Sequence, residues 1–186
     1  MNKLLVVGLG NPGELYQKTR HNIGFEILDY LADTKGVTFS NKKYGWICTF
    51  KLKGRTVYLL KPSTFMNLSG HSVRYYLQFY KINSDNMIIV TDDIHLPFGS
   101  IKLRRRGSDG GHNGHKDIIE KLEHNNYCRL KFGIGGQFPL GQQSSYVLDK
   151  WSDLESKSID RLVEKSAEAI LTFCHMGIDE TMKKFN

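Results

Sequence analysis

Short apolar runs alternate along this chain with longer segments whose apolar residues recur at helical spacing. Runs at residues 4–7 and 87–90 have the length of buried strands. Near the C-terminus, apolar residues recur every three or four positions and predict a helix over 159–174. Because strands and helices follow one another from end to end, the sequence predicts a single compact α/β domain that spans residues 1–186.

The same patterns assign most of the remaining chain. Strands are expected at 3–9, 46–52, 56–61, 87–90, 100–105 and 129–135, and further helices at 23–33, 69–80 and 112–122. Lys53-Gly54 separates two alternating runs, which is typical of a hairpin and therefore favours a mixed sheet. Asn22 stands directly before a predicted helix and could cap its N-terminus.

Composition excludes several classes of protein. With 186 residues, 40% of them hydrophobic, the chain can bury a core and is too apolar to be disordered. Its apolar runs fall far short of the ~20 residues that a membrane span needs, and no secretory signal is expected before the first strand. Three widely spaced cysteines, Cys48, Cys128 and Cys174, form no CxxC motif. A reduced, cytoplasmic setting is therefore expected.

Positive charge is concentrated in one stretch. The formal net charge is +7, and residues 102–131 contain eight Lys or Arg against four Asp or Glu. Such a cluster favours nucleic acid or a phosphate group, although a solvated surface is the commoner meaning of a charge run. The consecutive arginines 104–106 favour phosphate binding, because a guanidinium group donates in pairs to phosphate oxygens.

Polar side chains gather where the predicted strands end or where a helix begins. These are residues 11–21, Asn67, Asp92-Asp93 and His112-Asn113. In open α/β sheets, ligands bind beyond the carboxyl ends of the strands. We therefore expect these side chains to line one crevice.

Other interpretations of the motifs have less support. Residues 8–13 match the G-x-G-x-x-G pattern of dinucleotide-dependent oxidoreductases, but Pro12 removes a backbone N–H and the next residues lack helical periodicity. The segment 92–95 has side chains that could hold a metal, but it lacks a third and a fourth ligand. Neither G-x-S-x-G nor H-E-x-x-H occurs. No metal and no organic cofactor is therefore expected.

Five groups of motifs, in order along the chain, resemble those of bacterial peptidyl-tRNA hydrolases. They are GLGNPG (8–13) with TRHNIG (19–24), KPSTFMNLSG (61–70), DDIHLPFG (92–99), GGHNG (110–114) with KDII (116–119), and RLKFGIG (129–135). The resemblance runs from residue 4 to about residue 150. It implies one α/β domain with a twisted, mixed and mostly parallel sheet flanked by helices. It also implies cofactor-free hydrolysis of the ester between a peptide, or an N-blocked amino acid, and the terminal ribose of tRNA.

The resemblance further implies roles for individual residues. His21 would be the general base, Asp92 its partner carboxylate, and Asn11 the amide that distinguishes a blocked amino group from a free one. Residues expected at the peptide and the 3′ end are Tyr16, Phe65, Met66, Asn67 and Asn113. Residues expected at phosphates of the acceptor stem are Arg104, Arg106, Lys116, Arg129 and Lys131. A monomer without membrane contact or obligate protein partner is expected.

These residue types suit ester hydrolysis. An imidazole has an ordinary pKa near 6.5, so a neutral His21 can take a proton from water while a carboxylate fixes its tautomer. Carboxamides can pair with peptide groups or ribose hydroxyls without adding negative charge near phosphates. The alternative is an RNA-binding relative that has lost the base, and the presence of both His21 and Asp92 argues against it.

Three features depart from the usual pattern of the family. Asp109 occupies a position where a small residue is common, and His115 one that is commonly apolar. The segment 137–143 has no basic residue, although many relatives have one there. All three bear on tRNA affinity and leave His21, Asp92 and the asparagines unchanged.

Overall fold

A seven-stranded sheet runs through the computed structural model, which describes residues 3–186, in the order β2-β3-β4-β1-β5-β7-β6. The strands are β1 (Lys3–Gly8), β2 (Ser40–Lys42), β3 (Gly45–Leu52), β4 (Arg55–Pro62), β5 (Met87–Asp93), β6 (Ile101–Arg104) and β7 (Cys128–Gly133). The four inner strands β4, β1, β5 and β7 are parallel, and the outer strands are antiparallel to their neighbours. The predicted mixed sheet is confirmed, with three parallel and three antiparallel pairs of neighbouring strands.

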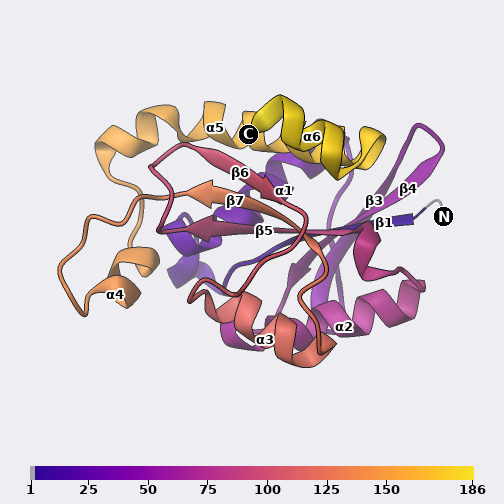
Figure 1. Cartoon of the computed structure of the whole chain (residues 1–186), viewed down its shortest axis with the longest axis horizontal. Coiled ribbons are helices and arrows are strands. Elements are labelled where there is room, and N and C mark those ends of the chain that lie inside the picture. The colour runs from indigo at the N-terminus through magenta and orange to yellow at the C-terminus, as the bar shows by residue number, and fades with distance from the viewer. Residues whose placement is uncertain (1–2) are drawn as a thin grey trace.

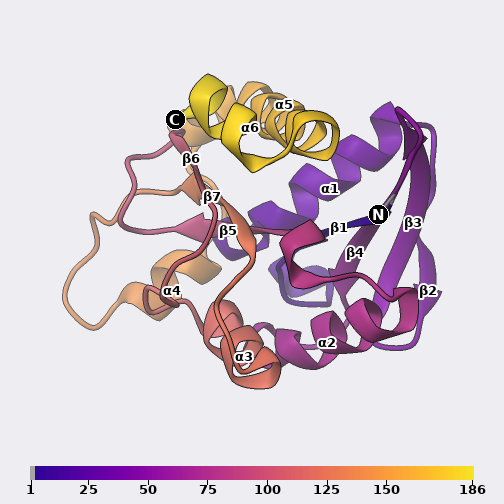
Figure 2. The same cartoon turned by 45° about the vertical axis from the view of Figure 1, so that its right-hand side comes forward.

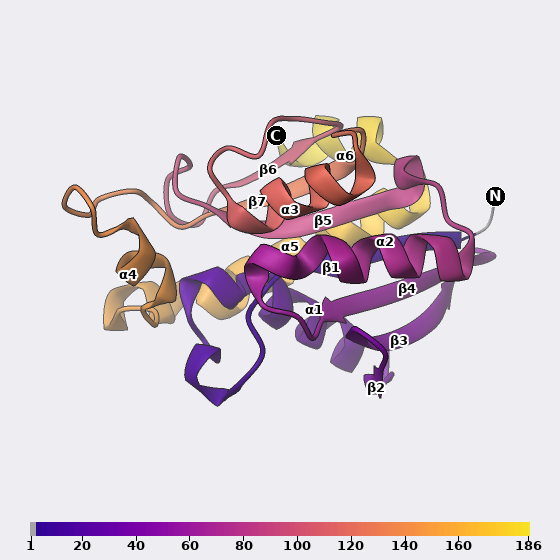
Figure 3. The same ribbon diagram turned by 90° about the horizontal axis from the view of Figure 1, so that it is seen from below.

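Helices cover both faces of this sheet (Figures 1 and 2). The helices are α1 (Ile23–Thr34), α2 (Ser69–Tyr80), α3 (Asn113–Leu122), α4 (Gln143–Leu148), α5 (Asp153–Met176) and α6 (Ile178–Phe185). Helices α1, α5 and α6 lie on one face, and α2 and α3 lie side by side on the other (Figure 3). None of the helices within residues 3–186 is both long and apolar enough to cross a membrane.

Strand β1, in the middle of the sheet, contributes side chains to the apolar cores on both of its faces. Side chains alternate across a strand, so Leu4 and Val6 join the cluster under α1 and α5, whereas Leu5 and Val7 join the cluster under α2 and α3. All four are buried. A strand that is apolar on both faces is typical of the middle of a three-layer α/β fold.

The structure differs from the predicted elements in a few places. Strand β5 extends to Asp93 because Thr91, Asp92 and Asp93 continue to pair with β7, although their side chains are polar. Strand β2 and helices α4 and α6 were not predicted. Asn22 does not cap α1; its side chain instead binds the backbone of Asn11.

Two glycines bring the start of α1 against the end of β1. A Cβ atom on Gly8 would lie 2.2 Å from the carbonyl oxygen of Gly24, and one on Gly24 would lie 2.5 Å from the backbone nitrogen of Leu9. Larger residues would separate the helix from the strand. This close approach places the 3₁₀ turn Arg20–Asn22, which precedes α1, directly at the carboxyl end of the central strands.

Candidate active site

A cavity of about 840 Å³ opens at the carboxyl ends of β1, β5 and β7. The predicted site residues that line it are Asn11, His21, Phe65, Met66, Asn67, Asp92, Asn113 and Lys131. The predicted convergence of the polar clusters on one crevice is therefore confirmed. Other parts of the wall come from the segment that leads into α4, which lies at the same end of the molecule as the loop after β1 (Figure 3).

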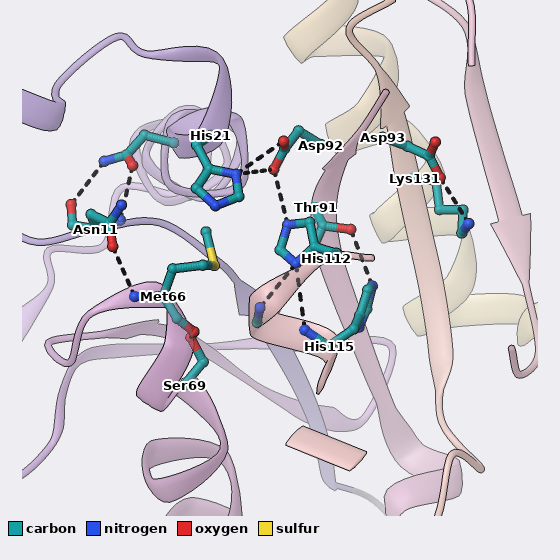
Figure 4. A network of polar contacts seen from close by, with 12 residues as sticks. Asn11, His21, Met66, Ser69, Thr91, Asp92, Asp93, His112, His115 and Lys131 are labelled. Carbon is teal, nitrogen blue, oxygen red and sulfur yellow. Dashed lines mark hydrogen bonds and ion pairs between the residues drawn. The ribbon is translucent and has the colours of Figure 1, made fainter. Parts of the chain in front are cut away.

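His21 and Asp92 form the central polar pair of this cavity (Figure 4). Nδ1 of His21 lies 2.9 Å from Oδ1 and 3.0 Å from Oδ2 of Asp92, and both side chains are buried. A carboxylate only accepts hydrogen bonds, so the proton of the neutral ring lies on Nδ1. Nε2 then carries a lone pair that can accept a proton from water.

A second imidazole faces the same carboxylate. Nε2 of His112 lies 3.1 Å from Oδ1 of Asp92 (Figure 4). Nδ1 of His112 accepts the backbone N–H groups of Gly114 and His115 at 3.1 and 3.4 Å, so this ring caps the N-terminus of α3. Because Nδ1 is an acceptor, the proton of His112 lies on Nε2 and is donated to Asp92.

Electrostatics couples the two members of the central pair. Burial alone would lower the pKa of His21, but the charge and the hydrogen bond of Asp92 outweigh it, so this pKa lies above its ordinary value of 6.5. Burial alone would raise the pKa of Asp92, but the facing imidazoles of His21 and His112 hold it below its ordinary value of 3.8. Asp92 is therefore ionised at neutral pH.

A third histidine lies buried behind the first two. Nε2 of His115 is 3.2 Å from the hydroxyl of Thr91, and its Nδ1 is 3.1 Å from the hydroxyl of Tyr127. Burial, together with the nearby His112 and Arg129, lowers its pKa well below 6.5. A polar residue at this commonly apolar position is thus satisfied by two hydroxyl groups and links α3 to the sheet.

The Asn11 side chain has a fixed orientation. Its Oδ1 accepts the backbone N–H of Met66 at 2.8 Å. The Asn22 side chain accepts the Asn11 N–H at 2.8 Å and donates to the Asn11 carbonyl at 2.9 Å. With Oδ1 occupied in this way, the amide nitrogen of Asn11 is left to donate to a ligand in the cavity.

The other predicted ligand-binding residues are placed differently from one another. Asn67 and Asn113 are exposed on the cavity wall, whereas Met66 both lines the cavity and belongs to the core under α2 and α3. Phe65 also lines the cavity and is half exposed. The ring of Tyr16 lies outside the lining and meets Phe65 edge to face, with ring centres 6.3 Å apart.

The basic residues divide into three kinds. Arg104, Arg106 and Lys116 are exposed outside the cavity lining, while Lys131 lines the cavity and forms an ion pair of 2.7 Å with Asp93. Arg129 is fully buried, and its guanidinium donates to the carbonyls of Gly107 and Ser108. The predicted phosphate contact of Arg129 is therefore wrong, because its side chain points into the protein and holds the loop at 107–108.

Asp109, another departure from the family pattern, stabilises a turn. It lies on the cavity wall, and its Oδ1 accepts the backbone N–H of Gly111 at 2.8 Å. Gly110 and Gly111 both have positive φ, 61° and 79°. The carboxylate thus supports the left-handed turn that precedes His112 and α3.

Sequence reasoning missed an arginine that supports the His21 turn. Buried Arg20 pairs with Glu155 of α5 at 2.7 Å, donates to the carbonyl of Tyr146 at 3.2 Å, and lies over the Tyr146 ring at 4.4 Å. Glu155 in turn closes the capping box of α5 with Ser152. Arg20 thereby ties the turn that carries His21 to α4 and α5. Its place in the TRHNIG motif, next to His21, was the signal in the sequence.

Within residues 3–186, one group of side chains has the spacing of metal ligands. One ligand atom each from His21, Asp92 and His112 lies within 4.8 Å of the others. In the observed arrangement both imidazoles turn a nitrogen towards the same carboxylate, so these atoms satisfy one another. The arrangement is that of two imidazoles hydrogen-bonded to one carboxylate.

Comparisons with known proteins agree on one family. Residues 5–186 match the family model described as peptidyl-tRNA hydrolase. A peptidyl-tRNA hydrolase of Azobacteroides pseudotrichonymphae is 51% identical over 184 residues, 99% of each chain, and one of Bacteroides fragilis is 50% identical over 99% of this chain and 98% of its own. A crystal structure of the peptidyl-tRNA hydrolase from Acinetobacter baumannii matches with a TM-score of 0.93 and 35% identity, covering 100% of this chain and 95% of the other.

Proposed function

Because the chain belongs to the peptidyl-tRNA hydrolase family, we propose that it releases peptides from tRNA with His21 as the general base. Its activity is that of a peptidyl-tRNA hydrolase, an ester hydrolase. The ester joins the peptide, or an N-blocked amino acid, to the 3′-terminal ribose. One observation carries the assignment of the base: the His21–Asp92 pair, with its second ring nitrogen left for solvent, on the wall of the cavity.

The proposed reaction begins with water bound at Nε2 of His21. The imidazole takes a proton as the water oxygen attacks the ester carbonyl, and Asp92 stabilises the imidazolium that forms. The amide nitrogen of Asn11 donates to the developing oxyanion. When the tetrahedral intermediate collapses, the ribose oxygen leaves and takes the proton back from His21.

Neutral amides and aromatic rings would bind the substrate on either side of the ester. Asn67 and Asn113 can each donate to and accept from peptide groups or ribose hydroxyls. Phe65 and Tyr16 offer rings against which a base of the 3′ end can stack, a contact worth about 1–3 kcal/mol. Met66 provides a flexible apolar wall for different peptide side chains.

Exposed basic residues would bind the acceptor stem. Arg104, Arg106, Lys116 and Lys131 are the candidates, and contacts to phosphates suit an enzyme that accepts many tRNA sequences. We expect affinity for tRNA to fall steeply as salt rises, with each lost phosphate contact lowering the slope of log Kd against log salt by about 1. Titrations of wild type and Arg104→Ala between low and moderate salt measure this. An unchanged slope would show that Arg104 makes no contact with a tRNA phosphate.

Replacement of His21 tests the general base. His21→Ala should lower kcat by about 10²–10⁴-fold and change KM little, because the imidazole takes the proton from water in the transition state and does not bind the substrate. Release of free tRNA from diacetyl-lysyl-tRNA measures both constants. His175→Ala, which removes an exposed histidine from the last turn of α5, is the matched control and should leave both unchanged. Normal turnover by His21→Ala would refute the assignment.

The alternative functions have no support in the observed geometry or the comparisons. A dinucleotide site would need a helix that begins at the glycine-rich loop, but residues 8–13 lead into the short 3₁₀ turn Glu14–Tyr16. A non-catalytic RNA-binding relative would not need the His21–Asp92 pair. The monomeric state and the cytoplasmic location stay predictions from the sequence.

A further inference from the structure

A second cavity of about 530 Å³ lies beside the active site. Its lining includes Pro12, Glu14, Lys18, Phe25, Glu26 and Trp46. Lys61, near the end of β4, and Trp46, near the start of the antiparallel β3, place it at the same edge of the sheet as the first cavity. The catalytic residues of the proposed mechanism, apart from Asn11, are absent from its wall.

Asn11 lines both cavities. Asn22 lines only the second, and its side chain holds the Asn11 backbone through two hydrogen bonds. An extended peptide advances about 3.3–3.6 Å per residue. A chain that starts at the ester beside His21 and crosses Asn11 therefore needs only a few residues to reach the second cavity.

The wall of this cavity suits an apolar side chain. The rings of Phe25 and Trp46 both line the cavity and meet edge to face with centres 6.3 Å apart. Glu26 lies beside them; burial raises its pKa to about 7, although Trp151 donates a hydrogen bond to it. Near neutral pH this carboxyl can accept from a peptide N–H when ionised, or donate to a peptide carbonyl when protonated.

The charges favour a peptide over RNA. The carboxylates of Glu14 and Asp29 face the ammonium groups of Lys18 and Lys61, and Glu26, with a pKa of about 7, is only partly ionised near neutral pH. Lys61 already forms an ion pair with Asp29. The wall therefore has no excess of positive charge with which to attract a phosphate backbone, whereas a neutral peptide segment needs none.

We propose that this second cavity is a subsite for the peptide of the substrate, which receives an apolar side chain located about two to four residues before the ester. The proposal rests on the proposed function, since it extends the peptide path that begins at His21. The ester and the base are unchanged by it. What it adds is a preference among peptides that Trp46 and Phe25 determine.

Two substrates that carry the same tRNA test the subsite. One is N-acetyl-alanyl-tRNA, and the other is an N-acetyl-tetrapeptidyl-tRNA that ends in the same alanine and has leucine at its first position. Wild type should show a KM for the tetrapeptide about fivefold to tenfold lower, the size of contact that one aromatic wall supplies. Trp46→Ala should abolish that advantage and leave kcat/KM for N-acetyl-alanyl-tRNA within about twofold.

A second variant tests the subsite without removing a packed side chain, because Trp46→Ala could lose activity through a folding defect. Gln17 is exposed on the rim of the cavity, so Gln17→Trp can fill the space without removing a packed side chain. It should cause the same selective loss. Gln78→Trp, at an exposed position on α2, is the matched control and should keep the wild-type preference.

Five outcomes are possible, and each either supports or overturns the subsite. Selective loss in both cavity variants supports the subsite. Equal losses on the two substrates, or no preference in wild type, would overturn it. Weaker binding of deacylated tRNA by Trp46→Ala would assign the cavity to RNA and also overturn it. Hydrolysis of neither substrate by wild type would refute the proposed function itself, and the subsite with it.

Discussion

The turn that carries His21 and the start of α3 that carries His112 present the same side chain to the same carboxylate, at 2.9 and 3.1 Å. They differ in what the second ring nitrogen does. In His112 it accepts two backbone N–H groups of a helix, whereas in His21 it is left for solvent. Only His21 can therefore exchange a proton without breaking a structural contact. The nitrogen left for solvent is what distinguishes the proposed base from the capping ring, since both rings lie equally close to the carboxylate.

The carboxylate that the two histidines share offers the strongest test of this difference. Asp92→Asn removes a charge-assisted hydrogen bond worth about 1.5–3 kcal/mol, so kcat should fall about 10- to 100-fold, less than for His21→Ala. Because Asp92 raises the pKa of His21, its loss should also move the rising limb of the pH–rate profile to lower pH. A profile from pH 5 to 9 measures both effects. A limb that stays in place would mean that His21 is not the titrating base.

The His21–Asp92 pair also makes the stability of the folded protein depend on pH. The raised pKa of His21 contributes stability below its unfolded value of 6.5, which is lost as pH rises through the folded value. The lowered pKa of Asp92 contributes stability above its unfolded value of 3.8, which is lost as pH falls through the folded value. The stabilisation by the pair should therefore be greatest between about pH 4 and 6.5, and Asp92→Asn should flatten the pH dependence of Tm across that window.

Loosening the support of one histidine gives an intermediate effect. Arg20→Lys keeps the charge but loses the paired geometry on Glu155 and the stacking on Tyr146, so the His21 turn should be held less firmly while the α3 cap is unaffected. We expect kcat to fall about tenfold through misplacement of the base, while the midpoint of the pH profile stays unchanged. Steady-state kinetics and Tm of this variant and of Arg105→Lys, which alters an exposed pair with Asp179, separate the two contributions. Equal results for the two variants would contradict a positioning role for Arg20.

The smallest effect is expected at His112. Asn is a good N-cap residue, so His112→Asn should keep α3 capped and lose only the hydrogen bond to Asp92, lowering kcat about threefold to tenfold. His112→Ala loses the cap as well and should cost about 1 kcal/mol of stability in addition. Kinetics and thermal unfolding of the two variants distinguish the roles. A loss of turnover as large as that of His21→Ala would show that the comparison between the two rings is wrong.

Much of the fold was predictable because its signals are local. The buried runs that became β1 and β5, the turn at Lys53-Gly54 and the stripe of α5 each show their period within a few residues. Helix α4 gave no such signal, since its sequence QSSYVL has little apolar periodicity and it is held by Arg20 from elsewhere in the chain. The extension of β5 likewise depends on pairing with β7, which only the tertiary structure supplies.

Site residues were predictable where a motif named them and not where packing decides their role. His21, Asp92 and the asparagines meet in one cavity as the motifs indicate. Arg129 was misassigned because a charge run does not show which of its members points inward, and β7 alternates between two covered faces. The cap formed by His112 was not recognised as a link to Asp92, because its geometry depends on two elements distant in sequence.

The two hydrogen bonds between Asn11 and Asn22 close a short loop at its neck. Residues at the neck are buried, whereas Gly13, Glu14 and Gln17 at the tip are exposed and are joined by the backbone hydrogen bonds of the short 3₁₀ turn Glu14–Tyr16. Mutations at the tip can accumulate during evolution without moving the neck. Since Gly13, Glu14 and Gln17 line the second cavity, a substitution at the tip alters the rim of that cavity while the neck keeps Asn11 in place.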